Sequence, residues 1–157
     1  LPIKGFDFGN SPWEIDQADL QDRELILRTT NGVAATLKAR DSKEVLVAGL
    51  VNAQATANYL REQNPPTVVL VASHPTGDED VACAEYIRHL LGGEGVSYAI
   101  ARERTLNARA AKKFYDGTHP RLRPQDIDAA AASEGDNALI MRVSFDPFPC
   151  ITAHRAP

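Results

Sequence analysis

The chain has 157 residues, of which 43 % are apolar, and a formal net charge of −4. This length suits a single domain with its own hydrophobic core, and the scattered Lys and Arg residues argue against a basic surface for nucleic acid or an anionic membrane. No apolar run approaches the ~18 residues that a membrane-spanning helix needs, and we find no signal-peptide pattern, so we expect a cytoplasmic protein.

Two cysteines, Cys83 and Cys150, lie far apart in the sequence and form no CxxC pair. They indicate neither a disulfide framework nor a zinc site, and reduced thiols fit the cytoplasm. The chain does not begin with Met, so we expect further sequence upstream.

The first part of the chain repeats a pattern of strand, turn and helix. Residues 25–30 form an apolar run that is too short for a helix, Asn31-Gly32 breaks this run, and an Ala-rich helix is predicted at 33–39. Residues 45–48 predict a second strand, and an amphipathic helix is predicted at 53–63.

A third unit begins with the strongest strand signal in the chain. Residues 67–72 are continuously apolar between turn residues, which predicts a strand buried on both faces. A helix is predicted at 79–91, and Gly92-Gly93 stand where a left-handed helix end is expected. Three such units in series predict an α/β fold, with three α/β/α layers and a mainly parallel sheet built from consecutive βα units.

The rest of the chain is less regular. Residues 96–102 predict a fourth strand, and helices are predicted at 105–115 and, after a proline, at 125–132. The final stretch, residues 138–157, begins with a short apolar run typical of a strand and continues as a proline-punctuated tail.

Ligands of open parallel sheets bind at the carboxyl ends of the strands, next to helix N-termini, and this rule selects three segments. Residues 29–32 (TTNG) and 49–53 (GLVNA) offer hydroxyls, amides and backbone N–H groups, which hold phosphate or another anion. Residues 73–80 (SHPTGDED) offer carboxylates, which hold Mg²⁺ or transfer protons.

Structural roles compete with ligand binding at each of these segments. Helix capping is the commoner use of side chains such as Thr30, Asn31 and Asn52. Residues 76–79 match the capping box, in which Glu79 would only bond back to the backbone.

Asp80 lies on the same helical stripe as Cys83 and Ile87, so its side chain is expected to face the sheet. An inward carboxylate needs partners, because a helix N-terminus stabilises an anion by only about 0.3–1 kcal/mol, less than the cost of burying it alone. Mg²⁺, an Arg or hydrogen-bond donors would serve, and a satisfied structural Asp is an equal alternative to a functional one. Cys83 is interpreted as a core thiol, because the Cys-x₅-Arg loop of cysteine phosphatases is absent.

Four segments together are similar to one known family. They are GFDFGNSP at 5–12, TTNG at 29–32, GxxNA at 49–53 and GDEDxxCA at 77–84. In this order and spacing the chain resembles the 2-phosphosulfolactate phosphatase family. That family comprises Mg²⁺-dependent phosphatases that hydrolyse phosphate monoesters of 2-hydroxycarboxylic acids, and it is named for a step of coenzyme M biosynthesis.

The resemblance implies a phosphoric monoester hydrolase that needs Mg²⁺ and acts on a small phosphorylated 2-hydroxy acid. An example is 2-phosphosulfolactate, which would give sulfolactate and phosphate. It also implies catalytic roles for Asp80, Glu79 and Asn31, with the two carboxylates as metal ligands. Substrate-binding roles are implied for other residues of the motifs, namely Asp7, Asn10, Ser11, Thr29, Thr30, Gly32 and Asn52.

Two departures from the family pattern bear on this interpretation. Relatives are usually longer, with an N-terminal βα segment that has no counterpart here. Residues 1–157 are therefore expected to be a single α/β domain that forms the C-terminal two-thirds of a longer phosphatase chain. Relatives also often continue the TTNG turn with Thr and then Arg, whereas this chain has Val33-Ala34-Ala35.

A second class of function is compatible with the same motifs. A non-catalytic module derived from that family would keep the turns that bind phosphate or sulfonate without turning over a substrate. In either case we expect a small-molecule ligand, no nucleic-acid partner and no membrane partner, and a homo-oligomer stays an open option.

Overall fold

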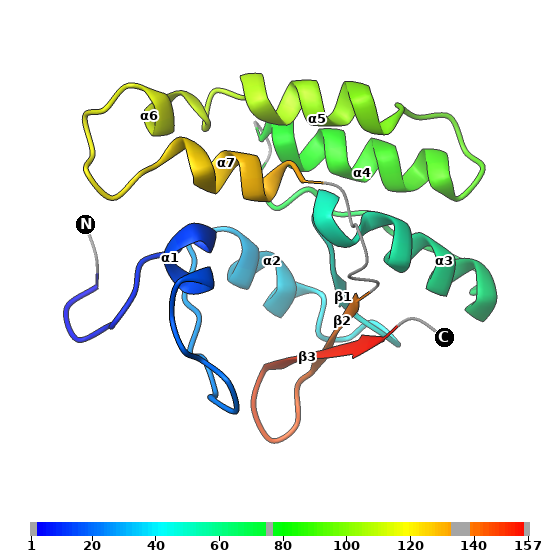
Figure 1. Cartoon of the computed structure of the whole chain (residues 1–157). Coiled ribbons are helices and arrows are strands. Elements are labelled where there is room, and N and C mark those ends of the chain that lie inside the picture. The colour runs from blue at the N-terminus through cyan, green and yellow to red at the C-terminus, as the bar shows by residue number, and fades with distance from the viewer. Residues whose placement is uncertain (1–2, 75–76, 133–138, 156–157) are drawn as a thin grey trace.

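The structure is a computed structural model that describes residues 3–74, 77–132 and 139–155 (Figure 1). Its helices are α1 (Pro12–Asp16), α2 (Gly32–Lys38), α3 (Ala53–Gln63), α4 (Asp78–Leu90), α5 (Tyr98–Asn107), α6 (Lys112–Tyr115) and α7 (Pro124–Ala130). Its strands are β1 (Leu46–Val47), β2 (Leu139–Ser144) and β3 (Cys150–Arg155), and a 3₁₀ turn, η1 (Leu50–Asn52), leads into α3.

The described strands form one antiparallel sheet in the order β1-β2-β3. β2 pairs with β3 along its whole length, from Leu139 opposite Arg155 to Ser144 opposite Cys150, and its other edge pairs with β1. The prediction of a mixed α/β protein is confirmed, but the prediction of a mainly parallel sheet is wrong for the described residues. The reason is that β1 takes its neighbour from the C-terminal hairpin and not from a strand of the next βα unit.

Two of the predicted strands, at residues 25–30 and 67–72, are not strands in the structure. Val69 and Val71 are 77 % and 65 % exposed, so the predicted burial on both faces is also wrong. A buried strand requires neighbouring strands that take up its backbone hydrogen bonds, and the described residues provide none for these two segments.

The fourth predicted strand, at residues 96–102, is also wrong, because α5 begins there. Ser97 is the N-cap of α5, and its Oγ accepts a hydrogen bond from the N–H of Ile100 at 3.4 Å. The residues that follow include Ala, Arg, Glu and Leu, which favour a helix, so the short apolar run was a misleading signal. The helix predicted at 105–115 is divided between the end of α5 and α6.

Four other helices were predicted correctly, whereas α1 was not predicted. The predictions at 33–39, 53–63, 79–91 and 125–132 correspond to α2, α3, α4 and α7. Gly92 follows α4 with a φ of +87°, the left-handed conformation expected there. The final stretch does begin with a strand, β2, but the prolines after it concealed β3.

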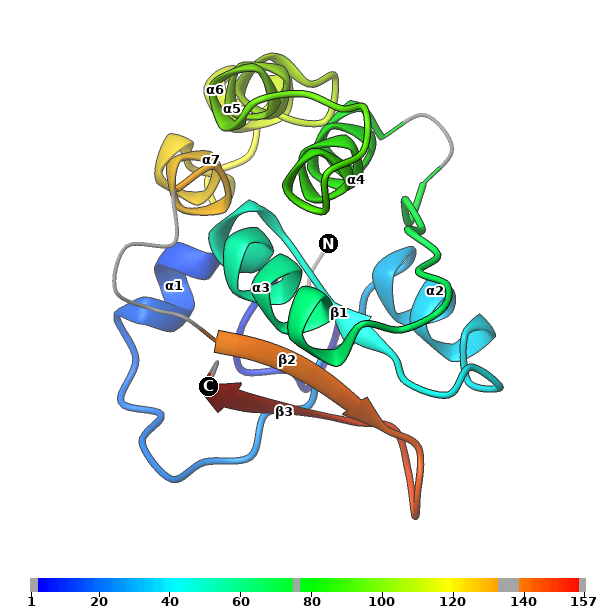
Figure 2. The same cartoon turned by 90° about the vertical axis from the view of Figure 1, so that its right-hand side faces the viewer.

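Helix α3 lies between the sheet and α4, as the two views agree (Figures 1 and 2). Its buried residues are small: Ala53, Ala55 and Ala57 are all 1 % exposed or less. Small side chains let a helix approach its neighbours closely on more than one side. Towards the sheet, Tyr59 packs with Ala55 and with Ile140 of β2.

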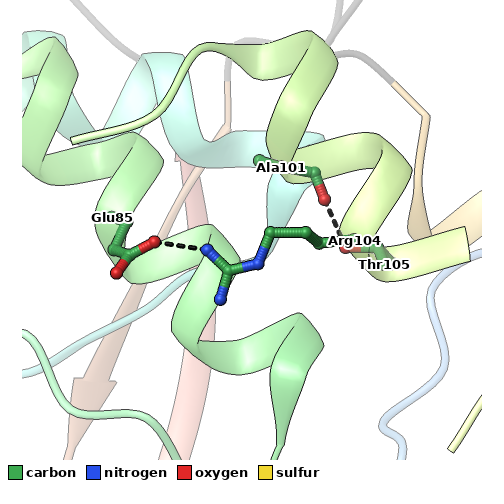
Figure 3. Close-up of polar contacts among 4 residues, drawn as sticks. All are labelled: Glu85, Ala101, Arg104 and Thr105. Carbon is green, nitrogen blue, oxygen red and sulfur yellow. Dashed lines mark hydrogen bonds and ion pairs between the residues drawn. The ribbon is translucent and has the colours of Figure 1, made fainter. Parts of the chain in front are cut away.

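Helices α4 and α5 pack side by side and are joined by an ion pair. The guanidinium of Arg104 on α5 contacts the carboxylate of Glu85 on α4 (Figure 3). The rings of Tyr86 and Tyr98 lie 5.8 Å apart between their centroids, in a tilted arrangement.

Helix α1 is attached to α7 by a buried carboxylate. Asp126 of α7 is 2 % exposed, and its Oδ1 accepts hydrogen bonds from the hydroxyl of Ser11 at 2.5 Å and the N–H of Trp13 at 3.2 Å. Its Oδ2 accepts from the N–H of Arg123 at 3.3 Å, and the Arg123 guanidinium lies 4.4 Å from the centre of the Trp13 ring. We call these four residues the Asp126 cluster.

We expect Asp126→Ala to lower the free energy of unfolding by about 2–3 kcal/mol, because the buried hydroxyl of Ser11 and the half-buried N–H of Trp13 would lose their acceptor. Asp128→Ala is the matched control, since Asp128 is exposed on the same helix, and we expect a change within about 0.5 kcal/mol. Urea denaturation measures both. Equal effects of the two substitutions would contradict the role assigned to Asp126.

Candidate functional site

The opening motif leads into α1 and is fixed by Ser11. As the N-cap of α1, Ser11 accepts a hydrogen bond from the N–H of Glu14 at 3.0 Å while its hydroxyl donates to Asp126. Ser11 is 7 % exposed, whereas Asp7 and Asn10 are exposed. Ser11 is therefore engaged in packing α1 on α7, and the side chains of Asp7 and Asn10 are the ones presented to solvent.

The TTNG turn is held by Thr29. Its Oγ1 accepts a hydrogen bond from the N–H of Val33 at 3.0 Å, in the first turn of α2. Asn31 occupies the N-cap position but makes no capping bond with its side chain. The structural alternative assigned capping to Thr30 or Asn31, whereas Thr29 provides it, which leaves Thr30 and Asn31 exposed. A Cβ on Gly32 would lie 3.3 Å from Oγ1 of Thr29, so Gly32 leaves room for the cap.

The GLVNA turn is held by Asn52. Its side-chain oxygen accepts from the N–H of Gly49 at 2.8 Å, and its side-chain nitrogen donates to the carbonyl of Val47 at 3.1 Å. Asn52 is 6 % exposed. It therefore caps η1 and ties it to the end of β1, a structural role of the kind expected, although for η1 and not for α3.

Asp80 closes the loop that precedes α4. Its Oδ2 accepts from the hydroxyl of Ser73 at 2.7 Å and from the backbone N–H of His74 at 3.1 Å. The donors expected near an inward carboxylate are thus present. A Cβ on Gly77 would lie 3.2 Å from this same oxygen, so the close approach of the loop favours glycine there.

Three consecutive carboxylates, Asp78, Glu79 and Asp80, occupy the first turn of α4. The capping box predicted for Glu79 depends on Thr76, which lies outside the described residues. Within the described ranges, no three or more His, Cys, Asp or Glu side chains converge to hold a metal ion. The assignment of Asp80 and Glu79 as Mg²⁺ ligands therefore stays a prediction.

Cys83 lies one turn after Asp80 and packs against the core formed by Leu50, Ala82 and Ala101. Burial, with a smaller contribution from the Asp80 carboxylate, raises the pKa of Cys83 from its ordinary value of 9.0 to about 12. The packing of Cys83 on this core confirms the prediction of a core thiol. The raised pKa keeps the thiol protonated at neutral pH, the form that is a poor nucleophile.

The four motifs are fixed one by one. The hydrogen bonds described above join each motif to itself or to residues directly beside it in the sequence and, for Ser11, also reach α7. These hydrogen bonds order each motif locally, and an apolar contact joins two of the motifs: Leu50 of the GLVNA turn packs in the same core as Ala82 and Cys83 of α4.

Sequence reasoning missed Asp126 and its partners. A carboxylate in the first turn of a proline-initiated helix is a usual stabilising feature, and it was the available signal. The hydroxyl that it binds, on Ser11, is 115 residues away in the sequence, and no local pattern reveals such a pair.

The structure thus defines a mixed α/β protein in which polar motifs precede helices, an arrangement suited to anionic ligands. The chain belongs to the 2-phosphosulpholactate phosphatase family, whose sequence profile matches residues 1–130. The resemblance found in the four motifs is confirmed. Within the described residues, no helix has the length and apolar character required to cross a membrane.

Curated relatives are named probable 2-phosphosulfolactate phosphatase. The Bacillus subtilis protein is 39 % identical over 147 residues, which is 92 % of this chain and 64 % of that protein. The Synechocystis protein is 32 % identical over 111 residues, 69 % of this chain and 46 % of that protein. This chain therefore spans less than two-thirds of the length of these relatives. No solved structure shows a significant match.

Substitutions of Thr29 and Thr30 test which of the two side chains caps α2. We expect Thr29→Ala to lower the free energy of unfolding by about 1 kcal/mol, because the N–H of Val33 loses its acceptor. Thr30→Ala should change it by less than about 0.5 kcal/mol, since this exposed side chain makes no hydrogen bond to the described residues. Urea denaturation checks both values, and a larger effect at Thr30 would contradict the assignment.

The raised pKa of Cys83 predicts a loss of stability at alkaline pH. The unfolded thiol ionises near 9.0 and the folded thiol only near 12, so the unfolded state binds fewer protons between these values and stability falls as pH rises through this window. We expect Cys83→Ala to make this fall shallower and Cys150→Ala, at an exposed position, to leave it unchanged. Denaturation curves between pH 8 and pH 11 are the measurement; identical slopes in both variants would contradict the prediction.

Proposed function

We propose that this chain is the larger part of a Mg²⁺-dependent phosphatase that hydrolyses phosphate monoesters of 2-hydroxycarboxylic acids, with 2-phosphosulfolactate as the example that gives sulfolactate and phosphate. The observation that carries the proposal is the family match over residues 1–130, which contains all four motifs. The relatives' printed name, probable 2-phosphosulfolactate phosphatase, supports the same substrate class.

The residues at the start of α4 fit a magnesium ion. Mg²⁺ takes hard oxygen ligands and is usually bound by one or two carboxylates while it keeps several waters. The described hydrogen bonds to Asp80 are accepted by Oδ2, and Glu79 is adjacent in the first turn of α4. When bound, the ion would supply positive charge that neutralises the phosphoryl oxygens. Asp80 and Glu79 are the residues proposed to hold it.

The contacts divide the other candidate residues into two groups. Ser11, Thr29 and Asn52 already use their polar atoms to fix their own turns, so we assign them to positioning. The exposed side chains make no hydrogen bond to the described residues and are the proposed substrate contacts, namely Asp7, Asn10, Thr30 and Asn31. Gly32 contributes backbone and the space for the cap. Phosphoryl transfer depends mostly on positioning and charge neutralisation, which is chemistry that such a set supplies.

The ligand would be a small phosphorylated acid, with neither nucleic acid nor a membrane as partner, and the protein would work in the cytoplasm. A role in coenzyme M biosynthesis is the version of this proposal that the family name suggests.

Phosphate release from a panel of 2-phospho-2-hydroxy acids, with Mg²⁺ and with EDTA, tests the proposal. We expect Asp80→Asn to lower the rate by at least about 100-fold, because the amide keeps the hydrogen bonds to Ser73 and His74 but loses the charge. Asp128→Asn, at an exposed position on α7, is the matched control and should retain the activity. Full activity in EDTA, or in Asp80→Asn, would overturn the metal role.

A non-catalytic anion-binding module is the second candidate. It is favoured by one observation, that this chain covers 64 % of the Bacillus relative while keeping the four motifs. In that case inorganic phosphate or sulfolactate would raise the melting temperature of the chain, and none of the phosphate esters would be hydrolysed.

A further inference from the structure

Two segments of the chain expose more apolar surface than their sequences predict. Each is a short run of large aliphatic residues, and isolated exposed residues of this type are common, whereas contiguous runs mark interaction surfaces. The exposed fractions are 57 % for Leu25, 86 % for Ile26, 57 % for Leu27, 38 % for Val68, 77 % for Val69 and 65 % for Val71. We call residues 25–27 and 68–71 the apolar segments.

The backbone of the apolar segments is also unpaired. No backbone N–H or carbonyl of residues 24–30 or 66–72 hydrogen bonds to another backbone group among the described residues. Unpaired backbone next to exposed aliphatic side chains is what a sheet edge presents to an incoming strand. These segments therefore have the chemistry of strands whose partner is missing from the described part of the chain.

Both apolar segments are held in place at their carboxyl ends. The first leads into Thr29, whose hydroxyl is fixed to α2, and the second leads into Ser73, whose hydroxyl is fixed to Asp80. They carry no charged residue, so a partner should be apolar as well. A segment anchored in this way loses less conformational entropy when a strand pairs with it than a fully mobile segment would.

We propose that the apolar segments are the docking surface for β-strand structure from the part of the family's chain that these 157 residues do not span. The length of the relatives supports this occupant, because the match covers 64 % of the Bacillus subtilis protein and leaves about a third of it without a counterpart. Docking there would bury the aliphatic side chains and pair the backbone at the same time. The paired strands would then lead directly into two of the candidate ligand-binding segments, 29–32 and 73–80.

Hydrogen exchange tests this proposal on two proteins: this chain alone, and this chain joined to the unmatched part of the Bacillus subtilis relative in the order in which that protein carries it. We expect the amides of residues 25–27 and 68–71 to exchange at least about 100-fold more slowly in the fusion. The amides of α3 serve as the internal reference and should change little. Equal exchange of the apolar segments in the two proteins would overturn the proposal.

A second copy of this chain is the competing occupant. In that case the apolar segments of the unfused chain would become protected as its concentration rises, and sedimentation would show a dimer. This result would overturn the proposal, because the surface would then be an interface between identical chains.

A pair of variants provides a second readout. We expect Val69→Lys to lower the melting temperature of the fusion by at least about 4 °C, because the proposed docking buries Val69 there. The same substitution should change the unfused chain little, since Val69 is 77 % exposed in it. Ile100→Lys is the matched control, because Ile100 is 47 % exposed and belongs to α5, which contains neither apolar segment. Equal effects of Val69→Lys in the fused and unfused proteins would contradict the proposal.

Discussion

The close packing of α3 is the constraint on which the rest of the structure depends. Three alanines of this helix are almost fully buried, and they let it contact the sheet on one side and α4 on the other. The turn capped by Asn52 begins this helix, and Leu50 of that turn joins the core on which Cys83 packs. A larger side chain at Ala55 or Ala57 would push these layers apart, because cores at this density accommodate added volume poorly.

The sequence predicted the helices better than the strands, and the reason is physical. A helix makes its backbone hydrogen bonds internally, so the stripe at 53–63 was sufficient to predict α3. A strand depends on neighbours, so the apolar run at 67–72 could not show whether a partner is present. The partner of β1 comes from residues 141–142, and such a pairing is not visible locally. The strand predicted at 96–102 was wrong for another reason, because Ser97 caps a helix there.

The candidate site shows the same division between local and distant contacts. The helical stripe predicted that Asp80 faces the sheet, whereas the described hydrogen bonds direct it to Ser73 and His74 of the preceding loop. Its need for donors followed from the cost of burying a charge. Thr29 caps α2, and its neighbours do not. This choice depends on the geometry of one turn, which the sequence does not show. The bond between Ser11 and Asp126 depends on the whole fold. Family membership, by contrast, was readable from the motifs alone.

The Asp126 cluster also sets an order of events during synthesis. Ser11 and Asp126 are 115 residues apart, so the first motif can reach its final position only after the chain through α7 has been made. The turns at Thr29 and Asn52, by contrast, are held by contacts within five residues and can form as soon as they emerge. Of the polar contacts described for the four motifs, the bond from Ser11 to Asp126 is therefore the last that can form, although the opening motif is the first to be translated.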